Sequence, residues 1–363
     1  GEVDATWFAT NRYVNLIGAS DKLDGETKIA TSPVAFGVWE DSAKRLGWDT
    51  KQPTWAEFAQ AAEAGEFSFG MTNPQASNSG FSALVAVATA LADTGDAIAP
   101  ADLERVGPRL EQLFQAQSMV SGSSGWLAEA FVDDPERADA IVNYEATLHQ
   151  MRQQGQPIEV VVPADGVISA DYPLSALSQP KNTDARERVD KLANWLLEHQ
   201  PEIADTFRRP VTQVDNMPAE IADQQVIELP FPANQGVVDE LLYAYDNSYR
   251  QPGTTTFVLD TSGSMEGERI ASLKDIMHSL IDGSASTLTG DVSLRDRENV
   301  TLQSFDSRPN APVTARFSHE DPAAAAELTE YVDGLSASGS TAMYQALLEA
   351  LRQTDPAGGI PSI

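Results

Sequence analysis

The run from Thr255 to Met265 limits the possible folds of this chain more than any other stretch. It begins with the apolar and β-branched residues Thr-Thr-Phe-Val-Leu and ends in the pattern Asp-x-Ser-x-Ser, formed by Asp260, Ser262 and Ser264. A short apolar run that ends in turn residues predicts a buried strand. A strand that stops on an acid and turns through Ser and Gly brings one carboxylate and two hydroxyls to one point.

These side chains supply hard oxygen ligands, which suit Mg²⁺, Mn²⁺ or Ca²⁺ better than zinc or copper. The alternative is an ordinary turn whose Asp and Ser cap the next helix. A second element favours the cation site. Residues 335–347 read Leu-Ser-Ala-Ser-Gly-Ser-Thr-Ala-Met-Tyr-Gln-Ala-Leu and place Thr341 directly before a predicted helix, Ala342 to Arg352.

The segment between these elements predicts how they meet. A helical pattern runs from Arg269 to Ile281, and a strand pattern runs from Asn299 to Phe305. Strand, helix, strand and helix in this order predict an α/β fold with a doubly wound parallel sheet. Its ligand site is expected at the carboxyl ends of the strands. In the helix before Arg352, the apolar residues Met343, Ala346, Leu347, Ala350 and Leu351 predict one face packed on the sheet.

The Asp-x-Ser-x-Ser motif and Thr341 resemble the metal-ion-dependent adhesion site (MIDAS) of a von Willebrand factor A (vWA) domain. The resemblance implies a Rossmann-like domain in residues 250–363, with Asp260, Ser262, Ser264 and Thr341 around Mg²⁺, Mn²⁺ or Ca²⁺. It also implies a protein partner that supplies a carboxylate to the open coordination position. The family takes a further Asp from a later Thr-Asp-Gly turn. Because the sequence reaches only Ile363, where the preceding strand would begin, we expect it to hold the N-terminal part of such a domain.

Residues 1–249 contain two serine-rich turns, each followed by a predicted helix. These are Ser77-Asn78-Ser79 and Ser123-Ser124. Unpaired N–H groups at a helix N-terminus favour anions, so the turns are candidate ligand contacts, together with Asn143 and Glu145. The alternative is that Ser and Asn simply cap these helices. A carboxylate such as Glu145 or Asp171 beside the ligand would select against anions.

The segments Ile29–Gly37, Asn73–Leu84, Ser121–Trp126, Asn143–Glu145 and Val160–Gly166 resemble bacterial extracellular solute-binding proteins of the type-II periplasmic binding class. The resemblance implies a two-lobed α/β module in residues 1–249. Lobe one would span about 1–32 and 164–249, and lobe two about 33–163. The chain would cross between lobes at Ser32-Pro33 and at Pro163–Asp165, with a small solute held in the cleft. The resemblance also implies an extracellular or cell-envelope location, with any signal or anchor outside the given sequence.

Composition excludes several classes of partner. The chain has 24 Lys and Arg against 54 Asp and Glu, a net charge of −30, which disfavours nucleic acid and anionic lipid. The absence of cysteine excludes disulfides and thiolate metal sites. No apolar run approaches the length of a membrane span. Arg208-Arg209 is the one concentrated positive spot, and we expect it to pair with carboxylates.

Enzyme chemistry has little support in the sequence. The 4 histidines are scattered, and neither a Gly-x-Ser-x-Gly elbow nor a P-loop is present. We therefore expect a non-enzymatic exported binding protein that joins a solute-binding-like module to a metal-dependent vWA module. Two alternatives stay open. One is a small-molecule or anion receptor with the vWA domain as a docking platform, and the other is a metal-assisted hydrolase, for which no base is evident.

Overall fold

The computed structural model describes residues 3–287, 290–353 and 360–363, and the chain divides into two compact units, residues 1–243 and 244–363. The division falls at the last residue of helix α11 (Gln235–Ala244), just before a π-helical turn (Tyr245–Tyr249). The sequence had indicated a domain boundary just after this turn. Each unit has its own sheets and core.

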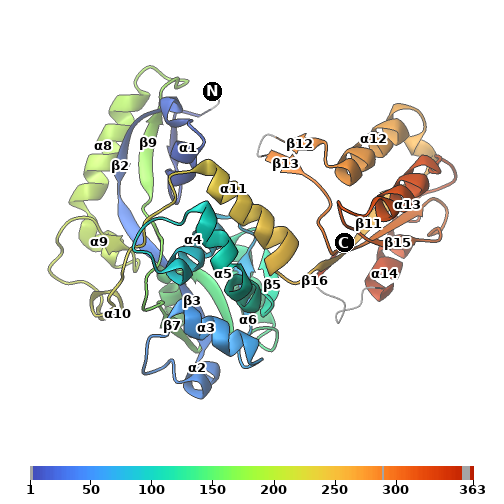
Figure 1. Ribbon diagram of the computed structural model, residues 1–363. Coiled ribbons are helices and arrows are strands. Elements are labelled where there is room, and N and C mark those ends of the chain that lie inside the picture. The colour runs from blue at the N-terminus through green and yellow to red at the C-terminus, as the bar shows by residue number, and fades with distance from the viewer. Residues whose placement is uncertain (1–2, 288–289, 354–359) are drawn as a thin grey trace. The chain divides into compact units, whose positions relative to one another are not determined.

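The larger sheet of unit 1 carries most of its helices (Figure 1). Its strand order is β10 (Arg209–Pro210), β3 (Ala30–Trp39), β6 (Ala140–Tyr144), β4 (Phe69–Thr72) and β5 (Gln117–Ser121), and β7 (Ile158–Val161) and β8 (Ser169–Ala170) also pair with β3. Strand β4 runs parallel to both β5 and β6. The associated helices are α2 (Glu40–Leu46), α3 (Trp55–Glu63), α4 (Asn78–Ala92), α5 (Pro100–Phe114), α6 (Ser124–Asp133) and α7 (Glu145–Gln153).

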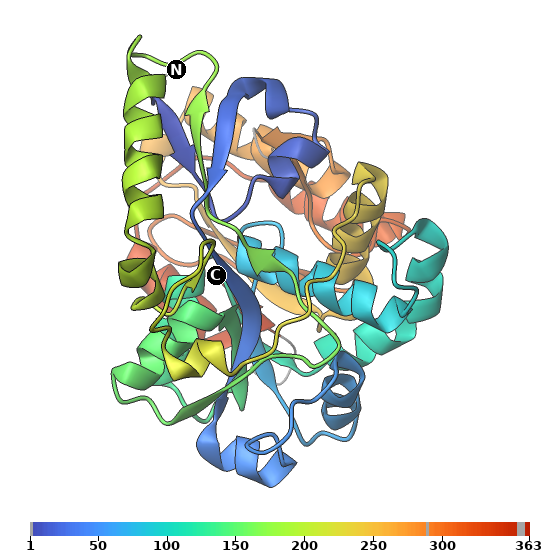
Figure 2. The same ribbon diagram turned by 90° about the vertical axis from the view of Figure 1, so that its left-hand side faces the viewer.

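The smaller sheet of unit 1 consists of β1 (Ala5–Trp7), β9 (Pro173–Leu177) and β2 (Leu23–Lys28), in that order. The shorter helices of this part are α1 (Arg12–Leu16), α9 (Gln200–Ala204) and α10 (Ala219–Ala222), with a 3₁₀ turn at Ser20–Lys22. Helix α8 (Ala185–Glu198) lies along the sheet (Figure 2) and packs through Ala193 on Leu174 and Ile29. The predicted crossing at Ser32-Pro33 lies inside β3, which continues through it as one strand.

Local sequence signals explain two helices that hold the larger sheet in place. Thr54 and Glu57 form a capping box at the start of α3, where the Thr54 side chain accepts from the Glu57 N–H. Helix α4 is buried on nearly all sides, as its unbroken Ala, Val and Leu composition requires. Apolar burial of this kind is the main stabilising term of such a core.

The main sheet of unit 2 has the order β15 (Val313–Arg316), β14 (Asn299–Phe305), β11 (Gly253–Asp260) and β16 (Ile360–Ser362). Strand β11 is parallel to β14 and β16, which confirms the predicted parallel core and the strand expected near Ile363. The antiparallel edge strand β15 was not predicted. A separate hairpin is formed by β12 (Ala285–Thr287) and β13 (Gly290–Val292).

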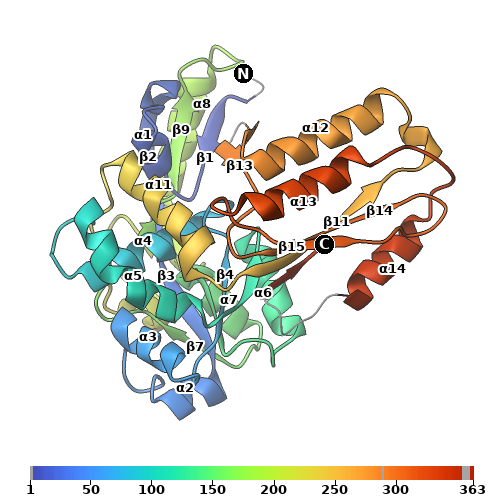
Figure 3. The same cartoon turned by 45° about the vertical axis from the view of Figure 1, so that its right-hand side comes forward.

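Helices cover both faces of this sheet (Figure 3). Helices α12 (Glu268–Asp282) and α13 (Pro322–Asp333) share one core with Leu259, Val300 and Leu302 of the strands. Helix α14 (Met343–Gln353) packs on β11 and β14 from the other face. Its Ala346 and Ala350 are buried as predicted, but Met343 and Leu351 are 43% and 62% exposed, so the prediction was wrong for those two. The apolar stripe of α14 is wider than the face that touches the sheet.

Candidate functional sites

The loop that follows β11 is fixed by its own side chains. Asp260 ends the strand, and its Oδ1 accepts a hydrogen bond from the Ser262 N–H at 2.8 Å. Both the N–H and the hydroxyl of Thr261 donate to the Phe305 carbonyl at the end of β14, each at 2.9 Å. The loop is therefore tied to the neighbouring strand with the Asp260 carboxylate held over the carboxyl edge of the sheet.

A second loop, which leads into α14 and carries Thr341, is joined to the first. The Ser338 N–H donates to the Thr261 carbonyl at 2.9 Å, and the Gly263 N–H donates to the Gly339 carbonyl at 3.1 Å. Gly339 has a φ of +69°, and a Cβ there would lie 2.5 Å from the Ser307 Oγ, so only glycine fits without strain. The structure thus brings the two predicted sequence elements together, as the parallel sheet requires.

The oxygens of this edge fit a hard divalent cation. The Ser262 and Ser264 hydroxyl oxygens lie 3.2 Å apart. Adjacent ligands of an octahedral ion with metal–oxygen distances of about 2.1 Å are about 3 Å apart, so both hydroxyls could bind one ion. Ser262 is buried, whereas Ser264 and Thr341 face solvent, so the edge is reachable from outside. Within residues 3–287, 290–353 and 360–363, no group of three or more His, Cys, Asp or Glu side chains has metal-site geometry.

In unit 1, the first serine-rich turn lies between β4 and α4. Ser79 is buried and its hydroxyl is 2.9 Å from that of Thr72, while the Ser77 hydroxyl is 3.3 Å from that of Ser79. Asn78, at the first position of α4, donates from Nδ2 to the Tyr144 hydroxyl at 3.1 Å. Ser77 and Asn78 are both only partly buried, so these two members of the turn can meet a ligand, and Ser79 cannot.

The second turn lies between β5 and α6. The Ser123 hydroxyl accepts from the Trp126 N–H at 3.2 Å, which is a capping role. Asn143, at the end of β6, donates from Nδ2 to the Ser124 carbonyl at 2.9 Å and accepts from the Tyr144 N–H. Because β4, β5 and β6 are parallel, the N-termini of α4, α6 and α7 gather along the carboxyl edge of one sheet. Hydrogen bonds link the β6–α7 junction to both other helices, from Asn78 of α4 to Tyr144 and from Asn143 to Ser124 of α6.

The two carboxylates that the sequence analysis considered beside a ligand are both paired with basic side chains. Glu145 is fully buried and receives two hydrogen bonds from Arg209, from Nε and Nη2, each at 2.8 Å. Burial raises the pKa of Glu145, and the guanidinium opposes that shift. Asp171 pairs with Lys28 at 3.1 Å. Both carboxylates that the sequence suggested would select against anions are therefore paired with a cationic side chain.

The two adjacent arginines have different roles. Arg209 pairs with Glu145, which confirms the predicted ion pair for this residue. Among the residues that the structure describes, Arg208 has no carboxylate partner, so that prediction was wrong for Arg208. Its guanidinium lies 5.3 Å from the centre of the Tyr172 ring, and its Nη1 donates to the Thr206 hydroxyl at 3.0 Å.

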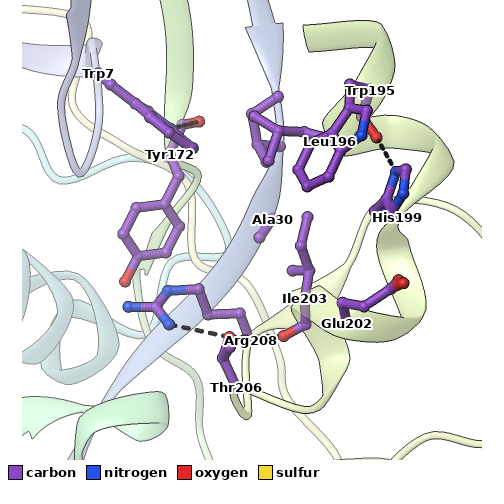
Figure 4. Close-up of a pocket in the computed structure, with 11 residues that line it drawn as sticks. Trp7, Ala30, Tyr172, Trp195, Leu196, His199, Glu202, Ile203, Thr206 and Arg208 are labelled. Atoms are coloured by element: carbon purple, nitrogen blue, oxygen red, sulfur yellow. Dashed lines mark hydrogen bonds between the residues drawn. The ribbon is translucent and has the colours of Figure 1, made fainter. Parts of the chain in front are cut away.

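A pocket of about 380 Å³ lies beside Arg208 and was not predicted (Figure 4). Most of its lining is aromatic or aliphatic. The lining residues are Trp7, Ile29, Ala30, Tyr172, Trp195, Leu196, His199, Glu202, Ile203, Thr206 and Arg208. They come from β1, the start of β3, the turn before β9, α8, α9 and the segment between α9 and β10, so only the Arg208-Arg209 pair gave a sequence signal. None of the predicted cleft residues lines it.

Comparison with known proteins identifies both units. Residues 1–209 match the model of the bacterial extracellular solute-binding protein family. The chain belongs to this family. Residues 255–357 of this solute-binding protein match the von Willebrand factor type A domain. No curated protein sequence matches the chain.

Several solved structures share parts of the fold. The sulfate-binding protein SubI from Mycobacterium tuberculosis H37Rv is 19% identical, with a TM-score of 0.49 over 65% of this chain and 80% of that chain. The periplasmic binding protein AfuA from Actinobacillus pleuropneumoniae, with fructose-6-phosphate bound, is 13% identical, with a TM-score of 0.47 over 67% and 75%. A periplasmic thiamin binding protein is 12% identical, with a TM-score of 0.46 over 62% and 68%.

Across the described part of this solute-binding protein, every helix is too short or too polar to span a bilayer.

Proposed function

We propose that this solute-binding protein is a non-enzymatic binding protein of the cell exterior or envelope whose vWA unit holds a divalent cation. Asp260, Ser262, Ser264 and Thr341 would surround the ion, and a carboxylate of a protein partner would take the remaining position. The observation that supports the proposal is the joining of the two loops by backbone hydrogen bonds, since these loops carry all four residues.

The chemistry of the ligands supports this role. Mg²⁺ and Mn²⁺ favour oxygen ligands and keep positions open for an external oxygen. The Asp260 Oδ1 accepts from the Ser262 N–H, which fixes the carboxylate and leaves Oδ2 for a water or the ion. A single carboxylate leaves net positive charge on a bound divalent ion. A carboxylate from outside would neutralise that charge, so a Glu- or Asp-bearing partner fits the site.

Binding of Mn²⁺ tests the metal proposal directly. Electron paramagnetic resonance reports free Mn²⁺. Circular dichroism reports the unfolding of both units, so a transition that tryptophan fluorescence does not show belongs to the vWA unit, which contains none of the 6 tryptophans. Asp260→Ala is expected to weaken Mn²⁺ binding about tenfold or more, because a charged ligand is lost. At a metal concentration 100 times Kd, the wild type should gain about 2.7 kcal/mol.

Asp275→Ala, on the exposed side of α12, is the matched control because it removes the same charge from the same unit. Equal Mn²⁺ binding by wild type and Asp260→Ala would refute the proposal, as would no binding at millimolar Mn²⁺. If a Glu-containing peptide binds equally well in Mg²⁺ and in EDTA, the proposed role of a partner carboxylate is refuted, and the metal site itself is not. Mg²⁺ and Ca²⁺ titrations decide which ion the site prefers.

A specific observation favours a second binding function for unit 1. The N-termini of α4, α6 and α7 are joined along one sheet edge through Asn78, Ser124, Asn143 and Tyr144. Helix N-termini favour an anionic solute through the helix dipole and through N–H groups that have no partner within the helix. We propose that a small oxyanion binds there, with Asn78 and the helix N–H groups as donors.

Sulfate and phosphate titrations followed by tryptophan fluorescence test this second function. Asn78→Asp places a like charge at the site and should weaken sulfate binding about tenfold or more. Gln153→Glu makes the same amide-to-carboxylate change at an exposed position of α7 and should leave binding unchanged. If Asn78→Asp binds sulfate as tightly as wild type does, the solute does not lie at this edge.

A further inference from the structure

The pocket beside Arg208 has two aromatic walls that are held in place by hydrogen bonds (Figure 4). On one side the Trp7 indole N–H donates to the Tyr172 carbonyl at 3.0 Å. On the other side the Trp195 and His199 rings stack with centroids 4.0 Å apart, and His199 Nδ1 lies 2.6 Å from the Trp195 carbonyl. Both walls exist before any ligand arrives, which lowers the entropic cost of binding.

The backbone at Tyr172 is held in an unfavourable conformation. Its φ is +41°, in the left-handed region that bulky residues rarely adopt. The N–H groups of Asp171 and Tyr172 both donate to the Ala9 carbonyl, at 2.9 and 3.0 Å, and this keeps the turn in place. Strained residues are concentrated where a side chain must be aimed at a ligand. In this pocket the strained residue is Tyr172, and its ring is part of the lining.

Arg208 supplies the positive charge of the pocket. The Glu145 carboxylate is bonded to Arg209. Among the described residues, Arg208 contacts the Tyr172 side chain and the Thr206 hydroxyl but no carboxylate. A half-buried guanidinium without a carboxylate is unusual in a chain that carries 30 more acidic than basic residues. Glu202, the other charged side chain of the lining, is exposed at the opposite side, where solvent screens it.

We propose that this pocket is a second ligand site, which binds a small monocarboxylate with an aromatic or branched aliphatic body. The carboxylate pairs with Arg208, and the body lies between Trp7 and Tyr172 on one side and Trp195 and Leu196 on the other. The volume of about 380 Å³ is typical of small-molecule sites. An inorganic oxyanion would leave the apolar walls uncovered, so the pocket distinguishes organic acids from sulfate or phosphate.

Phenylacetate and its neutral isostere phenylacetamide test the proposal on the full chain. Trp7 and Trp195 line the pocket, so fluorescence reports binding, and calorimetry gives the affinity. Phenylacetate is expected to bind about tenfold or more tightly than phenylacetamide, because only the acid makes a charge-assisted contact. Arg208→Gln should remove this preference, and Arg208→Lys should keep part of it because the charge remains. Arg188→Gln, at an exposed site on α8, should bind as wild type does.

Three results would overturn the proposal. The first is equal affinity for phenylacetate and phenylacetamide, and the second is unchanged phenylacetate binding by a folded Arg208→Gln variant. The third is displacement of phenylacetate by excess sulfate at constant ionic strength, which would show one shared site instead of a separate pocket. The proposal is supported if phenylacetate still binds wild type in excess sulfate and no longer binds Arg208→Gln. This holds whether or not sulfate binds at the helix N-termini.

Discussion

His149 makes the stability of unit 1 sensitive to acid. It lies on α7, only 5% exposed, and packs against Phe207 with ring centroids 5.3 Å apart. No described residue hydrogen-bonds either ring nitrogen. Burial, together with the nearby Arg152 and Arg209, lowers the pKa of His149 from 6.5 to about 4. The folded unit therefore keeps this ring neutral at pH values where an exposed histidine is protonated.

The direction and size of the effect follow from proton linkage. Because the pKa is lower in the folded state, the unfolded chain takes up the proton first as the pH falls. The stability that depends on neutral His149 is complete above about pH 6.5 and is lost as the pH falls towards 4. The whole difference corresponds to about 3 kcal/mol, of which about 2 kcal/mol is lost between about pH 7.5 and pH 5.

Urea unfolding followed by tryptophan fluorescence measures this loss in unit 1 alone, since all 6 tryptophans lie between residues 7 and 195. His149→Phe keeps a ring against Phe207 and removes the titrating group. Between about pH 7.5 and pH 5, wild type should lose about 2 kcal/mol more than His149→Phe does. His199→Gln, a partly exposed histidine of the same unit, should follow wild type. Parallel pH profiles for wild type and His149→Phe would refute the reasoning.

Two further changes test contacts that shape the sites. Arg209→Met leaves Glu145 buried without its cation and should cost about 3–5 kcal/mol, whereas Glu145→Gln combined with Arg209→Met should recover part of the loss. The same urea assay measures both variants, and equal losses would contradict the coupling. Gly339→Ala should lower the stability of unit 2 by about 1–3 kcal/mol, as judged by circular dichroism, because of its φ of +69° and the contact with Ser307. Gly283→Ala has a similar φ of +75° and meets only the Ser293 Cβ at 3.9 Å, an ordinary contact, so its smaller loss isolates the backbone term; equal losses in the two variants would exclude a role for the Ser307 contact.

The candidate cation site could be predicted from the sequence because its signals are local. The strand before Asp260 and the helix after Thr341 each have a clear period, and a parallel sheet brings such ends to one edge. Helix α13 carried signals that the sequence reading passed over. Asp321 caps it by accepting from the Ala323 N–H, and Pro322 is its first residue. The antiparallel strand β15 is short and mostly exposed, so its pattern is weak.

The pocket in unit 1 could not be predicted because its contacts connect distant parts of the chain. The hydrogen bond from Trp7 to Tyr172 joins residues 165 positions apart, and Glu145 meets Arg209 across 64 positions. Sequence shows two adjacent arginines and many carboxylates, but it does not show which arginine is paired. Arg209 lies in β10, where its side chain reaches the buried Glu145, and Arg208 just before it lies against Tyr172.

The strong negative charge of the chain gives a final test of the Arg208 pocket. At physiological ionic strength the Debye length is about 8 Å, so distant carboxylates act weakly and Arg208 dominates its surroundings. At about 0.01 M salt the Debye length is about 30 Å, and the net charge of −30 then opposes an arriving anion. Phenylacetate affinity should therefore rise from low to physiological salt, the opposite of a site on a basic protein. Calorimetry at the two salt concentrations measures the trend. An affinity that falls with salt would show that the charge near Arg208 outweighs the field of the whole molecule even at low salt.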